Sequence, residues 1–143
     1  MARYVVTVPS SKSPDNAFAY MADMRLFIEW DRGIKKVEQV VGNGPGEGAT
    51  FDVTVVGLGG RPATLRYVTT EWNPSTEVVL IGKGGGFTSV DRITVTPTAT
   101  GCDVTYDAKL SLNGLLSPFN PLLGLIFNKV GDRAAKGLRK VHA

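Results

Sequence analysis

The sequence is poor in the side chains that carry covalent and metal chemistry. It contains one cysteine, Cys102, and one histidine, His142. A single cysteine excludes an internal disulfide and any metal site built from several thiolates, so we expect no metal centre and no resident cofactor. Cysteine catalysis would need a base beside the thiol, and we expect the only imidazole to lie on a frayed chain end. Alternation places Cys102 at an inward strand position, where a free thiol is typically a small buried hydrophobe.

Long hydrophobic runs are also lacking. The longest apolar stretch, 112–127, is interrupted by Pro118 and Pro121 and is shorter than the roughly 20 residues that a membrane-spanning helix needs. The first eight residues, MARYVVTV, have the pattern of a strand and not of a signal peptide. We therefore expect a cytoplasmic protein that does not cross a membrane.

The composition is that of one folded domain. The chain has 143 residues, of which 43% are hydrophobic and 20% are charged, so we expect a single domain over 1–143 with a core of its own. The net charge is +3, and cations gather toward the C-terminus at Lys129, Arg133, Lys136, Arg139 and Lys140. These suit the C-terminal end of a helix dipole. Without interleaved exposed aromatic residues they do not favour nucleic acid as a partner.

Hydrophobic periodicity predicts the order of elements. A first strand (3–8) is followed by a helix that Ser13 caps and Pro14 begins, and by a second short helix (24–28). Alternation then predicts strands at 34–41, 49–56, 63–72, 77–82, 87–96 and 102–112. Helical spacing from 122 to 141 predicts a long amphipathic helix. The glycine-rich segments 42–48 and 82–86 lie between predicted strands, which favours hairpin loops over a phosphate site at a helix N-terminus.

One predicted strand breaks the apolar pattern of the interior. In 87–95 the inward set includes Ser89 and Asp91, and a buried carboxylate is costly unless it is hydrogen-bonded, paired or neutralised. A structural interpretation is that Asp91 lies near a strand end, bonds a neighbouring hydroxyl, or pairs with Arg66 or Arg92 after a bulge. A functional interpretation is that it orients a ligand, or transfers a proton, together with Ser89 and two tyrosines, Tyr67 and Tyr106.

The inward face of 63–71 and the location of the two tryptophans are less clearly defined by the pattern. Over 63–71 the inward set would include Leu65, Tyr67, Thr69 and Glu71. Trp30 and Trp72 fit either core packing or the rim of a cavity.

Six segments together resemble a known family. They are ADM (22–24), FIEWD (27–31), VTTEWNP (68–74), VDRITVTP (90–97), GCDVTY (101–106) and LSLNGL (110–115). In this order of elements the chain resembles the START-like helix-grip superfamily, and in particular the polyketide cyclase/dehydrase and lipid transport (SRPBCC) family. The resemblance implies an α+β fold, in which a curved antiparallel sheet of about seven strands wraps around a long C-terminal helix, with two short helices after the first strand.

The resemblance also implies an apolar cavity between sheet and terminal helix. Our leading hypothesis is that this cavity binds a hydrophobic small molecule, lipid or polyketide-like. The alternative is a polyketide cyclase or dehydratase type of enzyme, for which Asp91 is the one catalytic candidate. No catalytic residue can be transferred by a matching motif. The candidate ligand-binding residues are Trp30, Phe51, Val53, Leu65, Tyr67, Phe87, Ser89, Asp91, Tyr106, Leu110, Phe127 and Val130.

A third hypothesis gives the terminal helix the main role. Leu115, Leu116 and Leu125 adjoin the basic helix, and apolar and cationic groups together suit a membrane interface. The protein would then be an interaction module that docks on a partner or makes peripheral membrane contact. The sequence does not define the oligomeric state.

Overall fold

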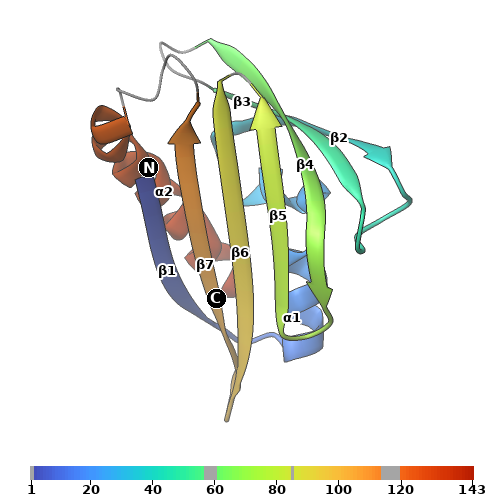
Figure 1. The fold of residues 1–143 in the computed structure, drawn as a ribbon. Coiled ribbons are helices and arrows are strands. Elements are labelled where there is room, and N and C mark those ends of the chain that lie inside the picture. The colour runs from blue at the N-terminus through green and yellow to red at the C-terminus, as the bar shows by residue number, and fades with distance from the viewer. Residues whose placement is uncertain (1, 57–60, 85, 114–119) are drawn as a thin grey trace.

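The computed structural model describes residues 2–56, 61–84, 86–113 and 120–143, with side chains from residue 131 onward in the last range. Seven antiparallel strands form one sheet in the order β1-β7-β6-β5-β4-β3-β2 (Figure 1). The strands are β1 (Ala2–Ser10), β2 (Ile34–Val41), β3 (Thr50–Val56), β4 (Pro62–Asn73), β5 (Glu77–Gly84), β6 (Phe87–Thr98) and β7 (Gly101–Leu112).

Three helical segments lie on one side of this sheet (Figure 1). They are α1 (Pro14–Met21), the 3₁₀ helix η1 (Met24–Glu29) and α2 (Asn120–His142). The Ser13 hydroxyl caps α1 by accepting a hydrogen bond from the Asn16 backbone N–H at 3.2 Å. Helix α2 packs against β1 and β7, α1 packs against β6 and β7, and η1 packs against β2. The curved sheet and α2 therefore enclose the core between them.

Two glycines let α2 approach its neighbours closely. A Cβ at Gly137 would lie 1.9 Å from the carbonyl oxygen of Trp30, and one at Gly131 would lie 2.3 Å from the Tyr4 ring. Glycine inside a helix costs about 1 kcal/mol relative to alanine, so close packing accounts for both positions. The Tyr4 hydroxyl also donates a hydrogen bond to Asp132 Oδ1 at 2.8 Å, which ties α2 to β1.

The predicted fold class is confirmed. The strands end within about two residues of their predicted bounds, and both short helices and the long C-terminal helix are present. The prediction that Glu71 points inward is wrong. A register shift between Thr69 and Glu71 interrupts the pairing of β4 with β5, so the alternation ends at Thr69 and Glu71 is exposed.

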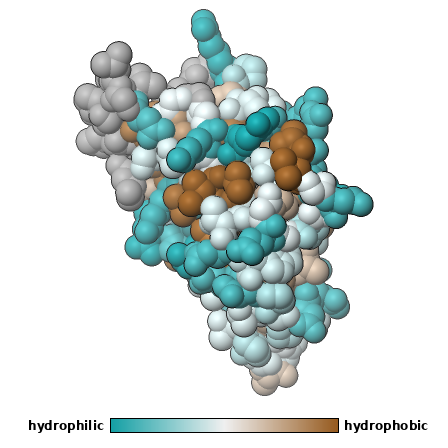
Figure 2. Space-filling view, turned by 45° about the vertical axis from the view of Figure 1, so that its right-hand side comes forward, coloured by the Kyte–Doolittle hydropathy of each residue, from teal (hydrophilic) through white to brown (hydrophobic). Residues whose placement is uncertain are grey.

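The outer face of the sheet is mainly polar. Bidentate pairs join Arg66 to Asp52 and Arg3 to Asp107. One apolar row crosses this face, where Val68 pairs with Ile81 and Ile81 with Val90. Figure 2 shows hydrophobic side chains gathered in a small area of the surface with hydrophilic ones around them. The outer face thus differs from the inner one, which holds most of the buried apolar side chains.

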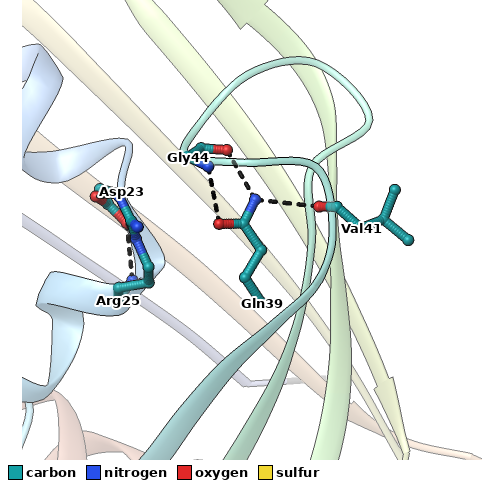
Figure 3. A network of polar contacts seen from close by, with 5 residues as sticks. All are labelled: Asp23, Arg25, Gln39, Val41 and Gly44. Atoms are coloured by element: carbon teal, nitrogen blue, oxygen red, sulfur yellow. Dashed lines mark hydrogen bonds and ion pairs between the residues drawn. The ribbon is translucent and has the colours of Figure 1, made fainter.

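The edge strand β2 is irregular and leads into the first glycine-rich loop. Its pairing with β3 shifts register between Ile34 and Lys36 and again between Gln39 and Val41. The Gln39 amide nitrogen donates hydrogen bonds to the carbonyl oxygens of Val41 and Gly44, while its oxygen accepts one from the Gly44 N–H (Figure 3). This loop joins two strands, as predicted, and lies at no helix N-terminus.

Candidate functional site

The inner face of the sheet gathers the polar residues that the sequence singled out. Tyr67 on β4 pairs with Gly82 on β5, and Gly82 pairs with Ser89 on β6. A Cβ at Gly82 would lie 2.6 Å from two carbons of the Tyr67 ring, so the ring lies over the glycine. The missing side chain at Gly82 makes room for Tyr67 beside Ser89 and Asp91.

Asp91 is hydrogen-bonded inside this group. It is 3% exposed, and its Oδ1 accepts a hydrogen bond from the Ser89 hydroxyl at 3.0 Å. The Tyr106 hydroxyl makes a longer contact of 3.5 Å with Oδ2. Tyr67, Ser89, Asp91 and Tyr106 are all buried, and we call these four residues the polar cluster.

Burial sets the protonation chemistry of the polar cluster. It raises the pKa of Asp91 to about 7, and the negative charge of Asp31 adds to the effect while the Ser89 hydrogen bond opposes it. Burial and the charge of Asp91 also raise the pKa values of Tyr67 and Tyr106 well above their ordinary range. At neutral pH the cluster therefore combines two neutral phenols with a carboxyl that is close to half ionised.

The expected arginine partners of Asp91 lie elsewhere. Arg66 forms its bidentate pair with Asp52, and Arg92 donates a hydrogen bond to Glu77 at 2.7 Å. Of the structural alternatives for Asp91, the hydrogen bond with a neighbouring hydroxyl is confirmed by Ser89, and the pairing with either arginine after a bulge is wrong. Both arginines point to the outer face, because β4 keeps an unbroken register with β3 at Arg66, and β6 keeps one with β5 and β7 at Arg92.

Trp30 borders the polar cluster from the end of η1. Its ring meets the Tyr106 ring edge to face at 5.3 Å and the Phe27 ring at 4.7 Å. Trp30 is 1% exposed, so it is a core residue and not part of a solvent-exposed rim. Its Nε1, like the hydroxyl of Thr69, is buried without a hydrogen-bond partner among the described residues. Buried polar atoms of this kind normally have a partner.

The other predicted site residues divide into three groups. Phe51, Val53 and Leu65 lie in the main core with the cluster. Phe87 and Leu110 are half-buried and pack against Ala2 and Leu112, and Phe87 also packs against the main core. The side chains of Phe127 and Val130 lie outside the described residues, as do those of Leu115, Leu116 and Leu125.

The prediction that His142 lies on a frayed end is wrong. His142 is 1% exposed, and its Nδ1 shares a hydrogen bond of 2.7 Å with the Ser10 hydroxyl. Its Nε2 lies 3.3 Å from Met21 Sδ, and its ring meets the Tyr20 ring edge to face. Burial lowers the pKa of His142 to about 4, so the imidazole is neutral at neutral pH. Packing of α2 across the ends of β1 and α1 buries this residue, which periodicity within the helix alone could not show.

Sequence reasoning also missed Asp31 and Gly82. Asp31 accepts a hydrogen bond from the Gly33 N–H at 2.9 Å, and burial raises its pKa. Asp31 directly precedes the turn at 32–33, and a carboxylate beside a turn is ordinary. Gly82 begins the glycine-rich segment 82–86, which favoured a hairpin loop, whereas the structure places it within β5 under the Tyr67 ring.

The described residues contain neither a cluster of metal ligands nor a membrane-spanning helix. Within 2–56, 61–84, 86–113 and 120–143 there is no group of three or more histidine, cysteine, aspartate or glutamate side chains that could hold a metal ion. Over the same residues, no helix combines the length and apolar character that crossing a bilayer requires.

The whole sequence matches the model of a known protein family. The family model described as polyketide cyclase / dehydrase and lipid transport matches residues 1–143. The chain belongs to this family. A search of curated proteins finds no match to this member of the polyketide cyclase/dehydrase and lipid transport family.

Solved structures extend the likeness to the fold. A START superfamily protein from Mycobacterium smegmatis has 13% identity and a TM-score of 0.77, with 99% of this chain and 95% of that chain covered. A protein from Thermus thermophilus has 14% identity and a TM-score of 0.75, with 97% of this chain and 94% of that chain covered. A protein from Deinococcus radiodurans has 14% identity and a TM-score of 0.68, with 99% of this chain and 93% of that chain covered. These neighbours share the START-like helix-grip fold, and family and fold are consistent with binding of a hydrophobic ligand.

Proposed function

We propose that this protein binds a hydrophobic small molecule, lipid or polyketide-like, between the inner face of the sheet and α2. Family membership and the helix-grip fold support this function. The apolar body of the ligand would contact Phe51, Val53 and Leu65, which belong to the core beside the polar cluster. Pockets of this type are mostly apolar and contain a few polar groups that fix the orientation of the ligand.

The observation that carries the proposal is the position of Asp91. The ionised form of a carboxyl that is 3% exposed and has no cation in hydrogen-bond contact among the described residues destabilises the fold. Proteins commonly bury such unfavourable groups at functional sites, where interactions with a ligand or substrate offset the loss of stability. A ligand that binds to Tyr67, Ser89, Asp91 and Tyr106 would provide the interactions that offset the burial of Asp91.

Mass spectrometry under native conditions tests this proposal. The protein is purified without detergent, its mass is measured, and bound molecules are extracted with organic solvent. A stoichiometric hydrophobic adduct is the expected result. Protein freed of ligand should then take up the neutral fluorescent probe N-phenyl-1-naphthylamine. A protein that carries no adduct and takes up no probe would contradict ligand binding and favour the interaction module.

A matched pair of variants locates the binding region. Ala108 is buried and pairs with Asp91 across β6 and β7, whereas Ala19 on α1 is exposed. Ala108→Val adds two methyl groups beside Asp91 and should weaken probe binding by about tenfold or more. Ala19→Val should bind the probe as the unmodified protein does. Circular dichroism confirms that each variant is folded before binding is compared, and equal probe binding by a folded Ala108→Val would place the probe elsewhere.

A second candidate function is proton transfer to a bound substrate, as in cyclases and dehydratases. The observation that favours it is the pKa of Asp91, raised to about 7 by burial, because a general acid or base works best when its pKa is near the operating pH. The extracted ligand, incubated with protein, should lose the mass of water on dehydration, or change its chromatographic retention at constant mass on cyclisation, only when Asp91 is present. Equal conversion by an Asp91→Asn variant would reject this role.

A further inference from the structure

We propose that the ligand of this protein carries a positively charged nitrogen, and that Asp91 holds this nitrogen among the aromatic rings around the polar cluster. The inference rests on the proposed binding function and adds the chemical class of the ligand. It predicts that apolar amines bind and that fatty acids of the same size are rejected.

The first argument is the absence of an internal cation. None of the lysine and arginine side chains that the structure describes is buried. The buried charged residues in the same ranges are Asp23, which pairs with Arg25 at 2.7 Å, and Asp91. A carboxylate uses up to four lone-pair positions, and from the part of the chain that the structure describes Asp91 receives two hydrogen-bond contacts, one of them long. An ammonium group would compensate its charge and use the remaining lone pairs.

The second argument is the sign of the local field. Asp31, held by the Gly33 N–H, adds negative potential at Asp91, Tyr67 and Tyr106 and helps to raise the pKa of each. Two carboxyl groups therefore act on one interior region, and Arg133, which is exposed, opposes only the charge of Asp31. A ligand carboxylate would be repelled there, because like charges in a desolvated site are unfavourable. A ligand ammonium would be attracted, and its presence would lower the pKa of Asp91.

The third argument is the set of aromatic rings. Trp30 and Tyr106 meet at 5.3 Å, Phe27 lies 4.7 Å from Trp30, and Tyr67 lies over Gly82 beside Ser89. Aromatic faces attract cations, and tryptophan does so most strongly. A carboxylate bordered by such rings is a chemical environment that suits an amine with an apolar body.

Two buried polar atoms without partners add an independent sign of a ligand. Trp30 Nε1 and Thr69 Oγ1 have no hydrogen-bond partner among the described residues, and both residues are 1% exposed. Thr69 pairs with Leu80 and Leu80 with Asp91, so Thr69 shares a cross-strand row of the inner face with Asp91. Polar atoms of the ligand beyond its nitrogen would give these two groups the partners that they lack.

The test compares three molecules with one apolar body. Decylamine, decanol and decanoate, each below its micelle-forming concentration, compete with N-phenyl-1-naphthylamine at about pH 8, where the Asp91 carboxyl is mainly ionised. We expect decylamine to bind about tenfold or more tightly than decanoate, with decanol between them. The net charge of +3 favours anions, so a preference for the amine cannot come from the overall charge of the protein.

Two variants assign the preference to Asp91. Asp91→Asn keeps the shape of the side chain and removes its charge, so the ratio of amine to carboxylate affinity should fall to within about threefold of unity. Asp103→Asn makes the same change of charge on β7, at a position that is not buried, and should retain the preference of the unmodified protein.

The outcomes separate the two proposals. Decanoate binding as tightly as decylamine, or an undiminished preference in Asp91→Asn, would overturn the inference while ligand binding stands. Failure of the probe and of all three competitors to bind would contradict the proposed function itself.

Discussion

At the scale of single residues, Asp91 couples the stability of the fold to pH. Burial raises the pKa of its carboxyl from 3.8 to about 7, so folding favours the protonated form. The contribution of this group to the free energy of unfolding is fully present below about pH 4 and is lost as the pH rises through about 7. Because one pKa unit corresponds to about 1.4 kcal/mol, the loss is on the order of 4 kcal/mol.

The variant Asp91→Asn tests this coupling. An amide cannot ionise, so the variant should be more stable than the unmodified protein by about 1–3 kcal/mol at about pH 8, less than the full loss because a buried amide also needs hydrogen bonds. The difference in the free energy of unfolding between the two proteins should shrink as the pH falls toward about 4. Urea denaturation across this range measures it. A difference that does not vary with pH would show that the carboxyl titrates alike in the folded and unfolded chains.

Gly82 is a second residue whose identity follows from its neighbour. In Gly82→Ala the new Cβ would lie 2.6 Å from the Tyr67 ring, so the ring must move away from Ser89 and Asp91. We expect a loss of about 1–3 kcal/mol in the free energy of unfolding, typical of overpacking. The same change in a Tyr67→Ala background should cost much less, because the ring is gone. Equal costs in the two backgrounds would show that the strand, and not the ring, requires the glycine.

At the scale of elements, His142 fastens the end of α2 to the turn between β1 and α1. Besides the Ser10 hydroxyl at 2.7 Å, the contact includes a backbone hydrogen bond from the Ser11 N–H to the His142 carbonyl oxygen at 3.3 Å. Burial lowers the pKa of His142 to about 4, and Lys12, the nearby cation, acts in the same direction. The stabilisation is therefore present above about pH 6.5 and is lost as the pH falls toward 4.

Removing this imidazole should loosen the last turn of α2. His142→Ala removes the imidazole from the Ser10 hydroxyl, which keeps only the hydrogen bond from the Lys12 N–H at 3.2 Å, and should reduce the free energy of unfolding by about 2 kcal/mol at neutral pH. Amide hydrogen exchange should accelerate most in the final turn of the helix. Lys140→Ala, at an exposed position of the same turn, is the control and should change neither quantity appreciably. Unchanged exchange in His142→Ala would mean that the remaining contacts hold the helix end by themselves.

At the scale of the whole molecule, local sequence patterns predicted the fold well because they determine most of it. Alternation placed Ser89, Asp91 and Tyr106 on the inner face, and turn residues marked the ends of the strands. The errors arise where distant segments meet. The partner of Asp91 depends on the register of β6, the exposure of Glu71 depends on a bulge in β4, and the burial of His142 depends on how α2 docks. None of these is encoded within a single element.

The irregular edge strand β2 also affects how copies of this protein meet in solution. An edge strand offers unpaired backbone groups to which a strand of another molecule can add, and this is a common first step of aggregation. In β2 the two register shifts distort that row of groups, and the exposed Lys35 and Lys36 place positive charge along it. The exposed Val40 and Val41 at its end would otherwise favour such pairing. Irregular pairing and the charged side chains of β2, among which Lys36 pairs with Glu38 at 3.7 Å, therefore protect the open edge of the sheet against edge-to-edge self-association.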